Sequence, residues 1–153
     1  MIQNNSNLPF LHYHLGEAHY ELGEYNSAIN NYKYEIRLNP NMSRAYYGLG
    51  NAYNKLKLSY QAILNYQISV NLMESGEDYE YRDSYEIPNS DIIIWAYCAI
   101  AVNVSNLRMD GFRGRLPNEC QYAYKAFELN KNKFVLTADA YKTLFRLVKT
   151  RCR

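Results

Sequence analysis

The chain has 153 residues, of which 48% are hydrophobic and 21% are charged, and its formal net charge is +2. These values are those of a folded soluble protein of one domain, which at this length buries roughly 70% of its unfolded surface. The chain does not start with a positively charged segment before an apolar run, and its longest apolar run, residues 92–102, has about 11 residues where a bilayer needs about 20. We therefore expect neither a secretory signal nor a membrane span.

The three cysteines, Cys98, Cys120 and Cys152, are odd in number, widely spaced and without a CxxC pair. This pattern indicates neither a disulfide framework nor a zinc site. We expect reduced thiols, a cytoplasmic location and no metal or other cofactor.

Residues 9–74 contain one pattern twice, with nine residues recurring 34 positions further along the chain. A period of this length, carried at helical spacing, indicates an array of helix-turn-helix units. The recurring residues are Leu15, Gly16, Ala18, Leu22, Ala28, Ile29, Asn31, Tyr32 and Leu38, and then Leu49, Gly50, Ala52, Leu56, Ala62, Ile63, Asn65, Tyr66 and Leu72.

The shared pattern LGxAxxxLxxxxxAIxNY resembles the tetratricopeptide repeat, a family of paired-helix repeats that bind other proteins. The resemblance implies an all-α fold, a right-handed superhelical array of antiparallel helix pairs. We expect a single domain over residues 1–153, with about three repeats and a C-terminal capping helix, and no enzymatic activity.

The first repeat, about residues 9–42, is expected to form helices from Phe10 to Leu22 and from about Tyr25 to Leu38. Gly23 is suited to ending the first helix, and Pro40 cannot continue the second.

Small residues are expected where the paired helices meet. We predict that Gly16 packs against Ala28 and that Gly50 packs against Ala62 in the second repeat. Tyr32 and Leu15 are expected to fill the space beside the first contact. Glu35 stands where the resembled family prefers a small residue. A carboxylate there is unfavourable unless it finds a partner or reaches solvent.

The second repeat, about residues 43–74, is expected to form helices from Ser43 to Lys57 and from Tyr60 to Met73. Its turn reads Lys57-Leu58-Ser59, so we expect the tight glycine turn of the first repeat to be lost.

An acidic insertion, about residues 74–90, breaks the period and is predicted to be a solvated loop. Ser90 is a candidate N-cap for the next helix, residues 92–107. That helix is apolar almost all round, which predicts burial between neighbours.

The divergent third repeat, about residues 91–132, ends in a helix that starts near Asn118, has a capping-box spacing to Gln121 and closes at Asn130. A capping helix, about residues 133–153, is expected to begin near Phe134. Its predicted apolar face comprises Tyr141, Leu144, Phe145 and Val148.

In the resembled family the first helices of successive repeats line a concave groove that takes a partner segment. Tyr and Arg offer contact area with a polar handle, and Asn can bond both a donor and an acceptor. The alternative is that this face is only solvated. The aligned positions are Phe10, Tyr13, Glu17, Tyr20, Glu21, Arg44, Tyr47, Asn51, Asn54 and Lys55.

Some members of the family grip the C-terminal carboxylates of chaperones with Lys, Arg and Asn. The aligned positions here are Tyr13, Glu17 and Gly48, with Ile93 and Tyr97 in the third repeat. Because none of these is cationic, we do not expect chaperone-tail binding.

No catalytic constellation is found. His12, His14 and His19 point to different faces of one helix, so a metal site is not expected, and Cys98 is predicted to be a small core residue. The segment GFRGR lacks the preceding strand and the Lys-Ser/Thr of a phosphate loop.

The charges are unevenly distributed. Residues 1–107 hold 6 Lys and Arg against 11 Asp and Glu, and residues 108–153 hold 11 against 4. The basic end could contact an anion, an acidic protein, nucleic acid or the acidic insertion, or it could simply solvate the cap. The candidate residues are Arg113, Arg115, Lys142, Arg146, Lys149 and Arg153.

We conclude that the sequence favours a protein-binding adaptor whose groove takes a protein or peptide partner. Binding of nucleic acid or an anionic surface at the basic end is the first alternative. The second is an oligomerising scaffold, because the apolar helix could exceed what one protomer covers.

Overall fold

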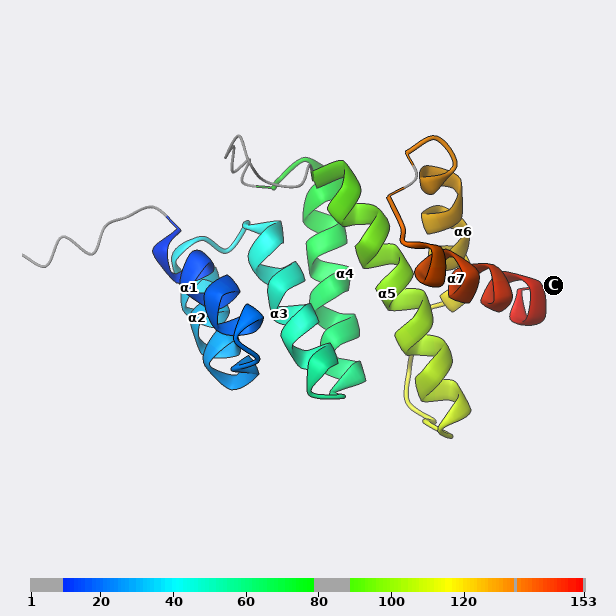
Figure 1. The fold of residues 1–153 in the computed structure, drawn as a ribbon, viewed down its shortest axis with the longest axis horizontal. Helices are drawn as coiled ribbons and strands as arrows, with labels where there is room; N and C mark the ends of the chain where they lie inside the picture. The colour runs from blue at the N-terminus through cyan, green and yellow to red at the C-terminus, as the bar shows by residue number, and fades with distance from the viewer. Residues whose placement is uncertain (1–9, 79–88, 134, 153) are drawn as a thin grey trace, which may run out of the picture.

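The computed structural model describes residues 10–78, 89–133 and 135–152 (Figure 1). These residues form seven α-helices and no β-strand, which confirms an all-α helical repeat fold. The helices are α1 (Leu11–Glu21), α2 (Tyr25–Leu38), α3 (Ser43–Lys55), α4 (Ser59–Ser75), α5 (Asn89–Met109), α6 (Glu119–Asn130) and α7 (Ala138–Arg151).

The helices follow one another as a stacked array, from α1 at one end to α7 at the other (Figure 1). Each helix packs against the next one in the chain, and α1 also contacts α3, α3 contacts α5, and α5 contacts α7. Within the described ranges, α2, α4 and α6 make no such contacts with one another. The first helices of the pairs therefore approach each other along an inner layer, and the second helices form an outer layer.

The glycines of the repeats make room for tyrosine rings. A Cβ added at Gly16 would lie 2.7 Å from the ring of Tyr32, and one at Gly48 would lie 2.6 Å from the same ring. The nearest side-chain atoms to Gly16 are those of the Tyr32 ring, which was predicted to fill the space beside the Gly16–Ala28 contact, so the glycine accommodates the bulk of an aromatic ring. Leu15, expected beside this contact, is 39% exposed.

The second repeat retains the tight turn that the sequence suggested was lost. Gly23 has φ +78° and Lys57 has φ +61°, both in the left-handed region. The hydrogen bonds of the two turns also match. The Glu24 N–H donates to the His19 carbonyl over 2.8 Å, and the Leu58 N–H donates to the Tyr53 carbonyl over 3.0 Å. Lysine thus adopts the conformation that glycine prefers.

Buried Glu35 finds one partner on α1 and one just after α2. Its carboxylate is 1% exposed and accepts the Tyr13 N–H over 3.2 Å and the Asn39 side-chain amide over 2.5 Å. Tyr13 lies in the first turn of α1, where backbone N–H groups have no partner within the helix. Because α1 has no side-chain cap of its own, Glu35 on α2 serves this end of α1.

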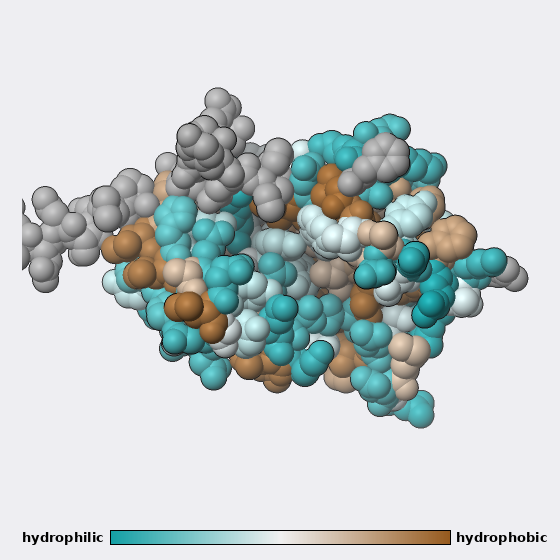
Figure 2. All heavy atoms as spheres, in the orientation of Figure 1, coloured by the Kyte–Doolittle hydropathy of each residue, from teal (hydrophilic) through white to brown (hydrophobic). Residues whose placement is uncertain are grey.

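Helix α5 is the central core helix of the C-terminal half. It packs against α4, α6 and α7, and Ile94, Ile100 and Val104 are fully buried. The segment Ser90–Met109 has the length and mean hydropathy of a membrane-spanning helix, although the uninterrupted apolar run at residues 92–102 is shorter. The packing of α5 against its neighbouring helices accounts for its apolar character. Helix α5 begins at Asn89, so Ser90 lies inside it and is not the predicted N-cap. On the face in Figure 2 the surface is mostly polar, with separate hydrophobic patches.

The last two helices form an antiparallel pair. Asn118 caps α6 as predicted, since its side-chain oxygen accepts the Cys120 N–H over 3.0 Å. Helix α7 starts at Ala138, later than expected, because the Thr137 hydroxyl caps it by accepting the Ala140 N–H over 3.3 Å.

The buried face of α7 differs from the predicted one. Leu144 and Leu147 are buried, whereas Tyr141 is 38% and Phe145 49% exposed. Both of these rings lie instead beside Phe127 of α6, at centroid distances of 5.3 and 6.4 Å.

The α6–α7 pair carries a disulfide that the sequence did not indicate. Cys120 near the start of α6 is bonded to Cys152 just after α7, with Cα atoms 5.4 Å apart. The expectation of three reduced thiols is therefore wrong. The antiparallel pairing brings together residues 32 positions apart, and their spacing alone gave no sign of it. Cys98 is free and buried, as predicted, and burial raises its pKa to about 11.

The Lys57 turn gives a stability prediction. We expect Lys57→Gly to raise the free energy of unfolding by about 0.5–1 kcal/mol, because glycine adopts positive φ without the strain of a Cβ atom. Urea unfolding of both proteins measures this. The matched control Gly23→Ala should change stability in the opposite sense, and a loss of stability in Lys57→Gly would contradict this account of the turn.

The disulfide predicts one reactive thiol, Cys98, when the oxidised protein is denatured without reductant, and three after reduction. Reduction should lower the free energy of unfolding by about 3–4 kcal/mol, because the bond restricts the unfolded chain. Thiol titration and urea unfolding measure these effects, and reductant should not affect Cys120→Ser. Three reactive thiols before reduction would show that the bond does not form.

Candidate functional site

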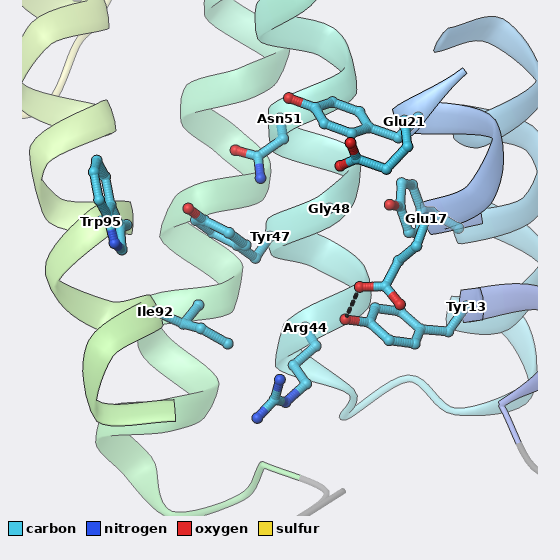
Figure 3. A pocket seen from close by; sticks show the side chains of 11 residues that line it. Tyr13, Glu17, Glu21, Arg44, Tyr47, Gly48, Asn51, Ile92 and Trp95 are labelled. Carbon is cyan, nitrogen blue, oxygen red and sulfur yellow. Dashed lines mark hydrogen bonds between the residues drawn. The ribbon is translucent and has the colours of Figure 1, made fainter. Parts of the chain in front are cut away.

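A groove of about 550 Å³ opens between α1, α3 and α5 on the inner layer of the array (Figure 3). It lies there because α3 contacts both α1 and α5, and each of the three helices turns side chains toward the hollow. Its walls consist of Tyr13, Glu17, Tyr20, Glu21, Tyr32, Arg44, Tyr47, Gly48, Asn51, Ile92 and Trp95.

Seven of the ten residues predicted for a groove lie around this hollow. They are Tyr13, Glu17, Tyr20, Glu21, Arg44, Tyr47 and Asn51. Of the other three, Phe10 packs against the core of the first repeats, while Asn54 and Lys55 are exposed near the end of α3. The Lys55 ammonium lies 6.0 Å from the ring centroid of Tyr20.

Sequence reasoning missed the wall that α5 supplies. Ile92 and Trp95 face the groove from this helix, opposite α1 (Figure 3). The signal that could have found it was the single tryptophan of the chain, on what is the first helix of a third pair. The alignment had placed Ile93 and Tyr97 at the third-repeat positions of a carboxylate-binding set, and Tyr97 is 1% exposed within the core.

The floor of the groove is held by hydrogen bonds within the protein. The Tyr66 hydroxyl donates to the Asn51 side-chain oxygen over 2.7 Å, and the rings of Tyr47 and Tyr66 have centroids 5.7 Å apart. Burial raises the pKa of Tyr47 to about 12, and a hydrogen bond with Asn51 opposes the rise. Asn51 is therefore held in place by tyrosines, and its carbonyl oxygen already has a partner.

The α1 wall is acidic. The Tyr13 hydroxyl donates to the Glu17 carboxylate over 2.7 Å, and Glu21 follows one turn later (Figure 3). The pKa of Tyr32 is raised, first by burial and then by the charges of Glu17, Tyr20 and Glu21. Arg44 occupies the other end of the groove and is 7% exposed.

The three histidines of α1 contact three different partners, as their spacing predicted. His12 lies 3.3 Å from the Asn31 side-chain oxygen, His14 3.3 Å from Glu17, and His19 2.6 Å from Glu24. Within residues 10–78, 89–133 and 135–152, no group of three or more His, Cys, Asp or Glu side chains could hold a metal ion.

The basic candidate residues lie apart from the groove. Arg113 and Arg115 are exposed between α5 and α6, Lys142, Arg146 and Lys149 are exposed on α7, and Arg153 falls outside the described residues. Other basic residues of this half already pair with acidic ones. Lys125 lies 2.8 Å from Glu74, and Lys133 lies 3.2 Å from Asp91. Most of the acidic insertion, residues 79–88, also lies outside the described residues.

Residues 16–57 match the family model described as TPR repeat. This part of the chain is therefore similar to tetratricopeptide repeats. Its fold is similar to the N-terminal domain of stress-induced protein-1 (STI-1) from C. elegans, with a TM-score of 0.64 and 13% identity over 89% of this chain and 91% of that one. At this identity the likeness concerns the fold alone. No curated protein sequence matches the chain. Tetratricopeptide-repeat domains generally mediate protein–protein interaction.

The buried tyrosines of this protein predict sensitivity to alkali. Tyr32 and Tyr66 have raised pKa values, and those of Tyr47 and Tyr97 reach about 12, in each case chiefly through burial. Because the folded pKa exceeds the ordinary value of 10.0, their contribution to stability is complete below pH 10 and is lost as pH rises toward 12.

Each tyrosine that ionises only in the unfolded state should lower the free energy of unfolding by up to about 1.4 kcal/mol per pH unit. Urea unfolding between pH 9 and pH 12 (about the range of these shifts), followed by tyrosinate absorbance, measures this. A constant free energy of unfolding across that range would contradict the burial of these hydroxyls.

Proposed function

We propose that this protein is a non-enzymatic adaptor that binds a segment of a partner protein in the groove between α1, α3 and α5. The observation that carries the proposal is the composition of the groove. Aromatic side chains from three helices surround a hollow that also contains carboxylate, guanidinium and amide groups. Aromatic residues and arginine supply most of the binding energy at protein interfaces, and fixed polar groups orient the bound chain.

The roles of individual residues follow from their positions. Trp95 offers contact area from one wall and Tyr20 from the opposite one. Tyr47 and Asn51 form a preorganised floor, because internal hydrogen bonds hold them before any partner arrives.

The alternatives have less support. The apolar helix α5, which suggested an oligomerising scaffold, is covered by α4, α6 and α7 of the same chain. The basic side chains that suggested nucleic acid binding are spread over the α5–α6 loop and α7, and they do not line the groove. A cytoplasmic location stays a prediction, and the Cys120–Cys152 bond bears on it, since disulfides persist chiefly in oxidising compartments.

The groove can be tested once a partner has been isolated from the source cell by affinity purification. We expect Trp95→Ala to weaken the affinity for that partner more than about tenfold, since a large aromatic contact at the centre of an interface is worth roughly 2 kcal/mol or more. The equilibrium dissociation constant measures the effect, with helicity checked by circular dichroism.

Phe145→Ala is the matched control, because Phe145 is an exposed aromatic residue on α7 that does not line the groove. This variant should bind the partner as the unmodified protein does. If Trp95→Ala also binds with unchanged affinity, the partner does not use the groove.

A further inference from the structure

The groove presents negative charge to an incoming ligand. The charged residues on its walls are Glu17, Glu21 and Arg44. The Glu17 side chain is 43% exposed and Glu21 is exposed, whereas Arg44 is 7% exposed. A ligand therefore meets the two carboxylates more readily than the guanidinium group.

The two carboxylates lie on the same wall. Glu17 and Glu21 are one helical turn apart on α1, so their side chains share one face of that helix. Figure 3 shows this wall opposite Trp95 of α5. Glu17 is held by the Tyr13 hydroxyl over 2.7 Å, so one carboxylate is positioned before binding.

Aromatic side chains complete a setting suited to a cation. Tyr20, Tyr47 and Trp95 line the same hollow, and the faces of such rings attract ammonium and guanidinium groups. The chain already makes one contact of this kind at the rim, where the Lys55 ammonium lies 6.0 Å from the Tyr20 ring centroid. The raised pKa of Tyr32, to which burial and then Glu17 contribute, agrees with a negative potential at the floor.

A ligand with a terminal or side-chain carboxylate fits this site poorly. Tyr13, Glu17 and Gly48, which stand at the positions of a carboxylate-binding set, all line the groove and carry no positive charge. Tyr97, from the third repeat, is buried and donates its hydroxyl to Glu74. Among the residues that line the groove the one cation, Arg44, is buried, so an acidic ligand would meet Glu17 and Glu21 first.

We propose that the segment bound in the groove is basic, and that one of its lysine or arginine side chains inserts between the carboxylates of Glu17 and Glu21 and the rings of Tyr20 and Trp95. This rests on the groove being the binding site. The carboxylates accept hydrogen bonds from the cation while the rings cover its aliphatic stem. The ligand is therefore positively charged, and the α1 wall of the groove recognises this charge.

A displayed library of random peptides tests this even before a natural partner has been isolated. It is selected against the full chain and against Trp95→Ala, Glu21→Gln and Glu24→Gln. Glu24 is the matched control, because it is an exposed carboxylate that pairs with His19 and does not line the groove. We expect peptides selected by the unmodified chain to be enriched in Lys and Arg, and the enrichment to persist with Glu24→Gln and to fall with Glu21→Gln.

The dissociation constant of one selected peptide, measured by fluorescence anisotropy, should rise about five- to tenfold in Glu21→Gln and should increase with salt concentration. Selection that depends on Trp95 but shows no excess of Lys and Arg, or an excess of Asp and Glu, would keep the groove as the binding site and overturn the cation preference. Peptides retained equally by Trp95→Ala, or a selection that yields no binders, would overturn both proposals.

Discussion

The packing of one tyrosine ring against two glycines is the constraint on which the rest of the structure depends. Tyr32 on α2 lies against Gly16 of its own repeat and Gly48 of the next, where any added Cβ would approach the ring to 2.7 and 2.6 Å. The ring is 2% exposed. One side chain thus sets the separation both within a helix pair and between pairs, and Tyr66 repeats the first of these contacts against Gly50.

The groove follows from this packing. The Tyr32 ring fills the space between α1 and α3. These two helices therefore make few direct contacts, and a hollow remains beside them. The same ring contributes to the floor of that hollow. Tyr66 performs the equivalent task one repeat later by holding Asn51. The residues that join the repeats are therefore the residues that shape and stiffen the candidate binding surface, so stability and recognition share one set of contacts.

Periodicity predicted the fold because it records local geometry. The bounds of α2 agree with the prediction, and Asn118 caps α6 as expected. Contacts that join distant residues were not predictable in this way. The disulfide depends on how α6 and α7 pair, and the capping of α1 by Glu35 depends on a carboxylate from another helix.

The candidate site was predicted to a similar extent. Positions on α1 and α3 could be aligned between two clear repeats. The acidic insertion interrupts the 34-residue period before α5, so the alignment of that helix was shifted and Ile92 and Trp95 were missed. The turn at Lys57 shows the opposite kind of error. There a residue type suggested a change of conformation, but the surrounding helices retained the turn at the expense of local strain.

The most direct test of this account is the free energy of unfolding of Gly48→Ala. Alanine in place of an unconstrained glycine within a helix stabilises a protein by roughly 0.5–1 kcal/mol. Here the new methyl group would meet the Tyr32 ring, so the account predicts destabilisation by about 1–3 kcal/mol. A Gly48→Ala protein as stable as the unmodified chain, or more stable, would contradict the claim that this ring sets the spacing of the repeats.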